Sequence, residues 1–312
     1  MIYKKSNFYQ LWKKKGLIIK PKKSSLWDRT HNMLPTPIYL GNDIFRIFFG
    51  TRNYDNQSCI SYAEIRLKKK IVVLKYSEKP SLKKGELGAF DDNGVLPSCI
   101  IKKKKYFLMY YIGWQPRVTT RYSLIAGLAI SKDGRNFKRY SNSPILSTNH
   151  NEPYSILTAP FVIKIKRNRW LMWYVSCKFW KNKNTPIYDI KYATSNNGFN
   201  WKQTGRSCII LKNGERAIAR PYVIYEKNKF KMWYSYEKKV GSYKIGYAVS
   251  KNGLKWKRHD NKIKFIDKKN KFKTDSKMKE YASIVAHNGE TYMFYNGNQY
   301  GKFGIECAQL IK

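Results

Sequence analysis

The segment 219–256 reads ARPYVIYEKNKFKMWYSYEKKVGSYKIGYAVSKNGLKW and contains every part of a unit that recurs along the chain. A short apolar run follows Pro221, an aromatic run contains Trp233-Tyr234, and a third run is centred on Ala248. An Asn-Gly turn follows the third run, and such dipeptides are typical of hairpins because they adopt positive φ. Tyr, Trp, Ile and Val favour strands. The segment therefore predicts three or four short antiparallel strands.

The aromatic run recurs five times, about sixty residues apart, and a repeat of that length is typical of solenoids and propellers. Four-stranded units repeated around an axis form a β-propeller. We therefore expect an all-β chain, a five-bladed β-propeller with blades of mostly four antiparallel strands, in one domain over residues 1–312. Two β-sandwich domains would explain the strands but not the regular repeat. The innermost strands are expected near 36–40, 96–101, 159–164, 220–225 and 281–286.

The fifth repeat ends at Leu310, soon after its third strand, and needs a closing strand. Gly16–Ile19 is the apolar segment near the N-terminus that fits this place. A strand from there would seal the ring, with both ends of the chain in one blade and the sheet edges protected.

The chain has 62 Lys and Arg residues against 20 Asp and Glu residues, a net charge of +42. Its hydrophobic content of 42% is too high for a disordered polycation. The lysines are spread along the whole chain, which favours a solvated basic surface over a specific nucleic-acid site. An anionic partner, such as a phosphorylated, nucleotide-linked or lipid-linked sugar, remains an open alternative.

No apolar run reaches the length of a membrane span, and the first residues have no signal-peptide pattern, so we expect a cytoplasmic protein. The five cysteines are widely spaced without a C-x-x-C pair, which argues against a disulfide framework and against a zinc site. We expect no metal, because His150, His259 and His287 do not form a ligand set with a fixed spacing. We expect no cofactor, and Walker, G-x-G-x-x-G and G-x-S-x-G motifs are absent.

Acidic residues are scarce, yet they precede every predicted inner strand. Because those loops form the rim of a propeller's central pocket, the sequence predicts a ring of carboxylates suited to glycoside chemistry or to binding sugar hydroxyls. Some of them could instead pair with arginines or cap loops. The residues are Asp28, Asp91, Asp92, Glu152, Glu215 and Glu280. Further candidates for substrate binding at the rim are Trp27, His31, Arg52, Trp114, Arg216, Arg220, Tyr281 and Asn296.

Five segments carry a resemblance to a known group: 85–98, 111–114, 219–221, 232–236 and 295–298. Together with the five repeats, they resemble the five-bladed β-propeller glycosidase superfamily. That group includes glycoside hydrolase family 43, the invertases and levansucrases of families 32 and 68, and the phosphorylases of family 130. The chain looks most similar to glycosylase-like proteins of bacterial surface-polysaccharide gene clusters.

The resemblance implies roles for specific carboxylates. By position, Asp28 would be the base or nucleophile, Asp92 (or Asp91) would stabilise, and Glu152 would be the acid. Asp28 lies further from its inner strand than the family pattern has it, and the stretch 34–37 contains no acid, so Glu280 could take a catalytic role instead. In relatives of family 130, basic residues hold phosphate, a role open here to Arg52, Arg216 and Arg220.

The expected function is that of a carbohydrate-active enzyme that cleaves or transfers a glycosidic bond with paired carboxylates. The setting implied by the resemblance is bacterial surface glycan metabolism. The alternative is a non-catalytic glycan-binding or scaffolding propeller. An enzyme requires at least two of Asp28, Asp92, Glu152 and Glu280 in one pocket, about 5–5.5 Å apart in a retaining and about 6.5–9.5 Å apart in an inverting mechanism.

Overall fold

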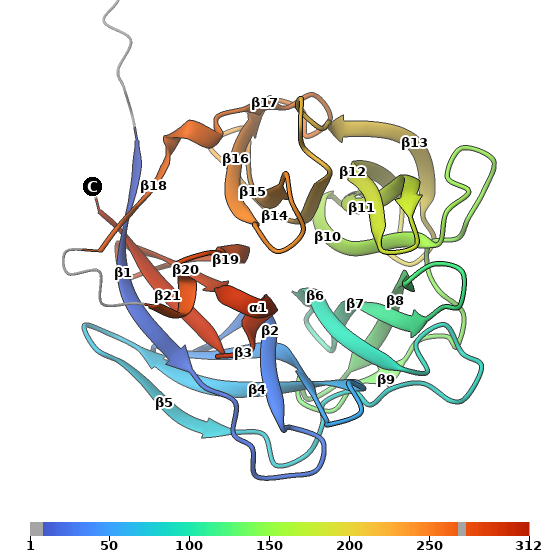
Figure 1. The fold of residues 1–312 in the computed structure, drawn as a ribbon. Coiled ribbons are helices and arrows are strands. Elements are labelled where there is room, and N and C mark those ends of the chain that lie inside the picture. Colours follow the sequence, from blue (N-terminus) through green and yellow to red (C-terminus); the bar gives the residue numbers. More distant parts are fainter. Residues whose placement is uncertain (1–8, 268–272, 312) are drawn as a thin grey trace, which may run out of the picture.

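The computed structural model describes residues 9–267 and 273–311. Figure 1 shows five blades arranged around a common axis, and nearly all regular structure in them is strand. The predicted all-β, five-bladed propeller is confirmed. In the described part of the chain, the only α-helix is the short α1 (Asn298–Gly301), and no helix is long and apolar enough to cross a membrane.

Each of the first four blades has four strands that pair antiparallel in chain order. Blade I contains β2 (Thr30–Gly41), β3 (Ile44–Arg52), β4 (Ser58–Leu67) and β5 (Ile71–Tyr76). Blade II contains β6 (Gly94–Lys102), β7 (Phe107–Pro116), β8 (Tyr122–Ser131) and β9 (Lys138–Arg139). Blade III contains β10 (Ile156–Lys166), β11 (Arg169–Asn182), β12 (Thr185–Ser195) and β13 (Lys202–Ile209). Blade IV contains β14 (Ala217–Glu226), β15 (Lys229–Glu237), β16 (Lys244–Ser250) and β17 (Lys257–Arg258).

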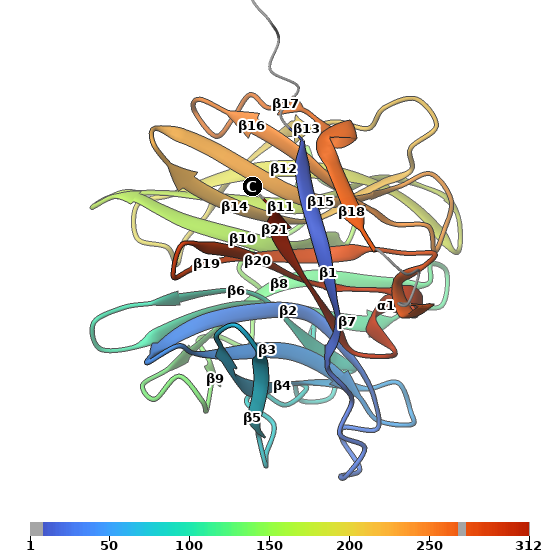
Figure 2. The same ribbon diagram turned by 90° about the vertical axis from the view of Figure 1, so that its left-hand side faces the viewer.

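Blade V is assembled from both ends of the chain. It contains β19 (Glu280–His287), β20 (Glu290–Asn296), β21 (Ile305–Ile311), β1 (Gln10–Ile19) and β18 (Ile263–Ile266). Strand β1 pairs antiparallel with β21 on one edge and parallel with β18 on the other (Figure 2). The closing strand is therefore longer than the expected Gly16–Ile19, and it is hydrogen-bonded along both edges.

The five inner strands contact one another all the way around the axis, and the contact between β19 and β2 closes the ring. Four of them contain a left-handed, non-glycine residue at the same place: Leu34, Ala159, Arg220 and Tyr281, with φ of 56°, 48°, 49° and 57°. The strand register shifts at each of these residues, which is a β-bulge.

The bulges turn side chains toward the axis. A bulge re-aims the residue it inserts, and it is often found next to functional sites. Leu34 and Ala159 belong to one apolar cluster, against which Tyr281 also packs. Strand pairing continues past the bulge, so the inner strands of blades I to IV begin two to six residues before the positions expected from sequence.

Ring closure depends on the side chains of β1. Trp12 is fully buried in the core of blade V, among Trp233, Ile284 and Met293. The Trp233 indole also donates a hydrogen bond to Gln10 Oε1 at 3.0 Å. The N-terminal strand therefore contributes to the core as well as to the sheet.

We predict that Trp12→Ala lowers the free energy of unfolding by about 3–5 kcal/mol, because it removes a large buried side chain and leaves a cavity. Lys13→Ala on the same strand is the control, since Lys13 is exposed and its loss should change stability by no more than about 0.5 kcal/mol. Urea titration followed by far-ultraviolet circular dichroism measures both. Equal effects of the two variants would contradict a core role for β1.

Candidate active site

In blade II, a predicted site carboxylate is used inside the blade. Asp91 accepts a hydrogen bond from the Tyr111 hydroxyl at 2.9 Å and another from Arg139 Nε at 2.9 Å. Arg139 lies on the outermost strand, β9. The intervening strand has Gly127, where a Cβ would lie 2.3 Å from the Tyr111 ring. The Asp91 carboxylate therefore links β7 to β9 by hydrogen bonds, and Gly127 of β8 leaves room for the Tyr111 ring between them.

Blade III repeats this arrangement with Glu152. Its carboxylate accepts hydrogen bonds from the Tyr174 hydroxyl at 2.8 Å and from Gln203 Nε2 at 2.9 Å. Lys191 Nζ lies 3.4 Å from Glu152 Oε1, and Gln203 belongs to the outermost strand β13. Only 1% of Glu152 is exposed, so its hydrogen-bonding capacity is taken up by protein groups.

Blade IV takes its carboxylate from a different loop. The Tyr234 hydroxyl is hydrogen-bonded to Asp260, which also accepts a hydrogen bond from Arg258 Nε at 3.0 Å. Arg258 lies on β17 and binds Glu215 through two hydrogen bonds of 2.8 Å. The predicted site residue Glu215 is thus one half of a bidentate ion pair at the outer part of the blade.

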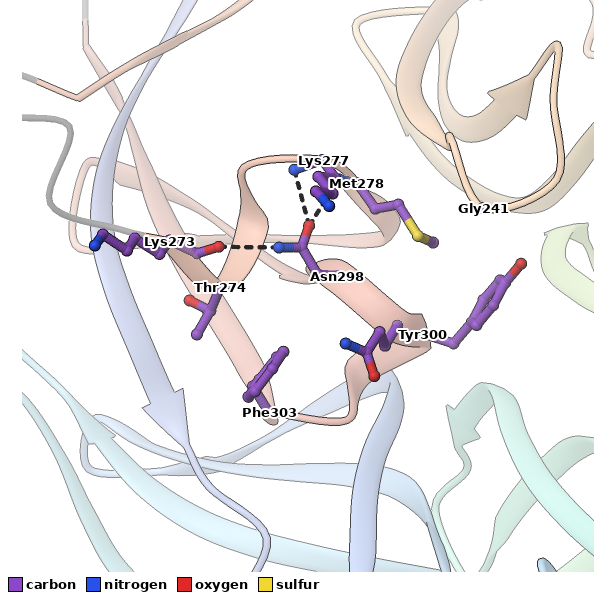
Figure 3. Close-up of a pocket in the computed structure, with 9 residues that line it drawn as sticks. Gly241, Lys273, Thr274, Lys277, Met278, Asn298, Tyr300 and Phe303 are labelled. Carbon is purple, nitrogen blue, oxygen red and sulfur yellow. Dashed lines mark hydrogen bonds between the residues drawn. The ribbon is translucent and has the colours of Figure 1, made fainter.

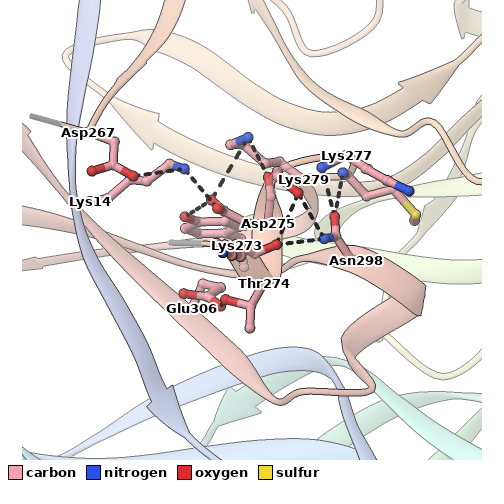
Figure 4. A network of polar contacts seen from close by, with 12 residues as sticks. Lys14, Asp267, Lys273, Thr274, Asp275, Lys277, Lys279, Asn298 and Glu306 are labelled. Atoms are coloured by element: carbon pink, nitrogen blue, oxygen red, sulfur yellow. Dashed lines mark hydrogen bonds and ion pairs between the residues drawn. The ribbon is translucent and has the colours of Figure 1, made fainter. Parts of the chain in front are cut away.

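Figure 4 shows the corresponding network in blade V. The Tyr295 hydroxyl donates to Asp275 Oδ2 at 2.7 Å, and Lys14 Nζ of β1 donates to Asp275 Oδ1 at 2.7 Å. Thr274 donates to Glu306 beside them. Here too the carboxylate joins the second strand of the blade to its closing strand.

The remaining predicted polar residues of the loops bind backbone groups. Asp28 Oδ1 accepts the N–H of Ser25 at 2.8 Å, and Asp92 Oδ2 accepts the N–H of Gly88 at 2.9 Å. Asn296 is fully buried and accepts a backbone N–H of β2 at 2.8 Å. These side chains shape the loops around the channel.

The four predicted catalytic carboxylates have different surroundings. Asp28, Asp92 and Glu152 bind groups of loops and strands in blades I to III, while Glu280 begins the inner strand of blade V. Their joint site stays a prediction. Glu280 instead interacts with a carboxyl group that was not predicted, that of Glu237.

Glu280 is the first residue of the inner strand β19, and its side chain is fully buried. Neither carboxyl oxygen has a hydrogen bond of normal geometry to any residue that the structure describes. Burial raises the pKa of Glu280 well above its usual range, Glu237 raises it further, and the Tyr281 side chain only partly opposes them. Both effects favour the protonated form of the carboxyl group over the charged one.

Glu237, the second carboxyl group, ends strand β15 and is 1% exposed. The Arg216 guanidinium donates a hydrogen bond to it, as does the N–H of Ser242 at 3.2 Å. Burial raises the pKa of Glu237, and Arg216 opposes the rise by stabilising the ionised form. Sequence reasoning missed Glu237, although it ends a second strand just as the predicted Arg52 ends β3.

Tyrosines surround these two carboxyl groups. The hydroxyls of Tyr188 and Tyr243 are hydrogen-bonded to each other. The Tyr243 ring lies 6.1 Å from the Tyr281 ring and 6.5 Å from the Tyr300 ring, measured between centroids. Tyr122 also lies near the pair, since Glu237 raises its pKa. Of these five, only Tyr281 is among the predicted site residues.

Basic groups occupy the blade I side of the channel mouth. Arg52 lies near Tyr281 and Arg121, and burial lowers its pKa. His31 has a pKa lowered to about 4, first by burial and then by the charges of Arg52 and Lys302. His31 is therefore neutral at pH 7. Through Tyr281, Arg52 lies near Glu280, whose pKa is raised, and near Glu237, which Arg216 already pairs with.

Arg220 crosses the channel from blade IV to blade I. Its Nη2 donates to the carbonyl of Pro35 at 3.1 Å and to Thr36 Oγ1 at 2.9 Å. Only 1% of the residue is exposed, and its Nε and Nη1 have no hydrogen-bond partner in the described residues. Burial lowers the pKa of Arg220 to about 10. The predicted site residue Arg220 is thus a buried cation between the inner strands.

A pocket of about 460 Å³ lies beside α1 (Figure 3). Asn298 fixes this segment, because its Oδ1 accepts the N–H groups of Lys277 at 2.8 Å and Met278 at 2.9 Å. Gln299 and Tyr300 both have left-handed backbone, with φ of 59° and 56°. Such strain in non-glycine residues is common at ligand clamps. It holds Tyr300 where both channel carboxyl groups act on its pKa.

Within the described ranges, no group of three or more His, Cys, Asp or Glu side chains is placed to hold a metal ion. The arrangement in the channel mouth instead joins one protonated acid, one arginine-bound carboxylate and several aromatic hydroxyls. Such a set can donate a proton, stabilise a developing positive charge and pack against a ring-shaped ligand.

The raised pKa of Glu280 predicts how the stability of the protein depends on pH. Because its folded pKa lies above the unfolded value, the wild type loses stability as pH rises from the unfolded pKa through the folded one. Glu280→Gln removes this loss, so it should gain stability relative to wild type between pH 5 and pH 8. Urea midpoints at both pH values measure the gain. The exposed Glu86→Gln is the control and should show none; an equal change in both variants would contradict the assignment.

No protein-family model matches the chain. It is 34% identical to the uncharacterized protein Rv1502 of Mycobacterium tuberculosis over 301 residues, which cover 96% of this chain and 99% of that protein. A solved glycoside hydrolase superposes with a TM-score of 0.73 at 18% identity, covering 98% of this chain and 93% of that one. A thermostable family-43 glycoside hydrolase superposes with a TM-score of 0.65 at 16% identity, covering 93% and 92%.

The structural matches show which fold the chain has, and the 34% identity to Rv1502 shows to which family it belongs. Each superposition covers more than nine-tenths of this chain and of the glycoside hydrolase. The resemblance to the propeller glycosidases read from the sequence is thus confirmed. The chain belongs to the same family as Rv1502 and has the five-bladed propeller fold of the glycosidase superfamily.

Proposed function

We propose that the protein is a carbohydrate-active enzyme that cleaves or transfers a glycosidic bond in the mouth of the central channel. Glu280 is the proton donor and Glu237 the second carboxylate. The observation that carries the proposal is the fully buried Glu280, whose raised pKa favours its protonated form, beside the arginine-bound Glu237. The glycosidase fold supports the substrate class.

The proposed chemistry needs two carboxyl groups in opposite protonation states. The Glu280 proton goes to the glycosidic oxygen as its bond to the anomeric carbon breaks. Glu237 then either attacks the anomeric carbon or takes a proton from the incoming water, phosphate or sugar hydroxyl. The environments of the two groups fit these roles, because Arg216 stabilises the charge of Glu237 and no cation in residues 9–267 and 273–311 pairs with Glu280.

The tyrosines and cations suggest how a sugar would be held. Tyr243, Tyr281 and Tyr300 offer ring faces to a sugar and hydroxyls to its polar groups. Arg52 and Arg220 favour a substrate with a negative charge, such as a phosphorylated, nucleotide-linked or lipid-linked sugar. We place the reaction in cytoplasmic steps of bacterial surface glycan metabolism, on the basis of the sequence resemblance.

A non-catalytic glycan-binding propeller is the second candidate. It is favoured by one observation: Asp28, Asp92 and Glu152, the acids expected to do the chemistry, all bind protein groups. If that candidate holds, Glu280 serves only to shape a binding site.

We predict that turnover is lost about 10²–10⁴-fold in Glu280→Gln, as for a missing general acid. Glu237→Gln should also lose turnover, while Glu86→Gln should keep it. The assay is a panel of aryl glycosides and nucleotide sugars, with and without phosphate. The wild-type rate should fall as pH rises through the raised pKa of Glu280.

The outcomes separate the alternatives. Phosphate dependence of the wild-type rate would identify phosphorolysis, and release of a reducing sugar without phosphate would identify hydrolysis. Sugar binding without turnover, unchanged in both carboxyl variants, would refute the enzyme and leave the glycan-binding propeller.

A further inference from the structure

A second pocket lies outside the channel, at the seam between blades I and II. Its volume is about 500 Å³, which is in the usual range of small-ligand sites. It is referred to here as the Trp27 pocket. Its floor and walls include Trp27, Cys59 and Pro80, and three lysines also line it. It shares no lining residue with the pocket beside α1.

The Trp27 indole is held by a closed turn. The N–H of Lys23 donates to the Asp28 carbonyl at 3.1 Å, and the N–H of Asp28 donates to the Ser25 carbonyl at 3.3 Å. The Asp28 carboxylate accepts the Ser25 N–H at 2.8 Å. Asp28 therefore fixes the loop that presents Trp27, which gives the carboxylate a positioning role at this pocket.

The side of the pocket formed by Ser58 is held in place by hydrogen bonds to blade II. Ser58 lines the pocket, donates to the Val95 carbonyl at 3.2 Å and accepts a hydrogen bond from Trp114 Nε1 at 2.9 Å. A Cβ on Gly94 would lie 2.2 Å from both Ser58 Oγ and Trp114 Nε1, so this seam between the blades has no spare room. The predicted site residues Trp27, Asp28 and Trp114 thus gather here and not at the channel acids.

The charge around the pocket is of one sign. Lys79, Lys83 and Lys84 line it and are exposed, and no carboxyl side chain lines it. Among the described residues, none of these three lysines forms an ion pair, whereas Lys68 and Lys75 of the same blade pair with carboxylates at 3.2 and 3.4 Å. The pocket therefore presents three ammonium groups that pair with no described carboxylate, while the buried Asp28 near Cys59 is bound to the Ser25 N–H.

We propose that the Trp27 pocket is a second carbohydrate-binding site that takes one negatively charged sugar unit, carrying a carboxylate or a phosphate, from a longer glycan. The apolar face of the sugar ring packs on the indole, and the lysines neutralise the anionic group. The amides of Asn53 and Gln57, which also line the pocket, face the hydroxyls.

Two features favour a glycan over a nucleic acid. Single-stranded nucleic acids bind along grooves in which successive bases stack on several aromatic side chains. The Trp27 pocket has one aromatic face and the volume of a small ligand. Asn53 of the pocket directly follows Arg52, which lies near Tyr281, so the pocket and the candidate active site share one segment of blade I.

The test uses calorimetric titration in the Glu280→Gln background, so that no turnover consumes the probe. The probes are tetragalacturonate for a carboxylate, mannose 6-phosphate for a phosphate, maltotetraose as a neutral sugar and an eight-residue oligothymidylate. Trp27→Ala and the double variant Lys83→Ala/Lys84→Ala test the pocket. Lys104→Ala/Lys105→Ala, in the β6–β7 hairpin, is the control with the same loss of charge.

We expect at least one anionic sugar to bind, and both pocket variants to weaken it roughly tenfold, the effect of losing one aromatic or charge contact of moderate strength. The control should bind as the parent does. Which sugar binds more tightly identifies the carboxylate or the phosphate as the preferred group.

The proposal is overturned if neither anionic sugar binds, if the control loses as much affinity as the pocket variants, or if maltotetraose binds equally well. Trp27-dependent binding of oligothymidylate that is tighter than that of both sugars would identify a nucleic-acid site instead. Unfolding midpoints of all variants show whether each is folded. The result is independent of catalysis, so it stands whether or not the channel is an active site.

Discussion

The interaction on which the molecule most depends is the hydrogen bond from a second-strand tyrosine to a buried carboxylate. It recurs in blades II to V, each time with a polar group from the fourth strand, counted from the axis, as another partner. In blade I, Phe49 stands at the position of the tyrosine, and Ser61 and Ser77 hydrogen-bond to each other at 2.7 Å instead. A buried carboxylate with all its partners in place is far less costly than one left alone.

Because these carboxylates are hydrogen-bonded inside the blades, few acidic side chains are left for the candidate active site. A chain with 20 acidic and 62 basic residues commits at least one carboxylate to each of four blades. The candidate active site contains Glu280 and Glu237, and among the residues that the structure describes, only Glu237 of these two has a cationic partner. The carboxylates of blades II to V are hydrogen-bonded, whereas Glu280 has no such partner among the described residues. A buried acid without a partner destabilises the fold, so its presence indicates a functional role.

The fold was predictable from the sequence because an aromatic, strand-forming segment recurs five times, about sixty residues apart. This regular spacing predicts both the strands and the number of blades. The site was predictable only in part. The rule that rim loops carry the functional side chains selected Glu280, Arg216, Arg220 and Tyr281, which are part of the candidate site proposed here. It also selected Asp91 and Glu152, which turn outward to a tyrosine of their own blade.

The direction of a side chain in these loops depends on long-range contacts. A bulge at Arg220 and a glycine opposite Tyr111 decide which way a neighbouring group points, and neither is visible in local composition. Glu237 escaped notice for the opposite reason. It ends a strand whose sequence resembles the core of every other blade, so only its place beside Arg216 distinguishes it.

The two-sided pairing of β1 has a consequence for synthesis of the chain. This strand is made before its partners, residues 263–266 and 305–311, which follow it by about 250 to 300 residues in the chain. Until then, both of its hydrogen-bonding edges are unpaired, which is the condition under which strands join other chains. The run Lys13 to Lys15 lies in the middle of this strand. Charges so placed act as gatekeepers, and they keep the waiting strand apart from its copies on neighbouring ribosomes until the ring can close.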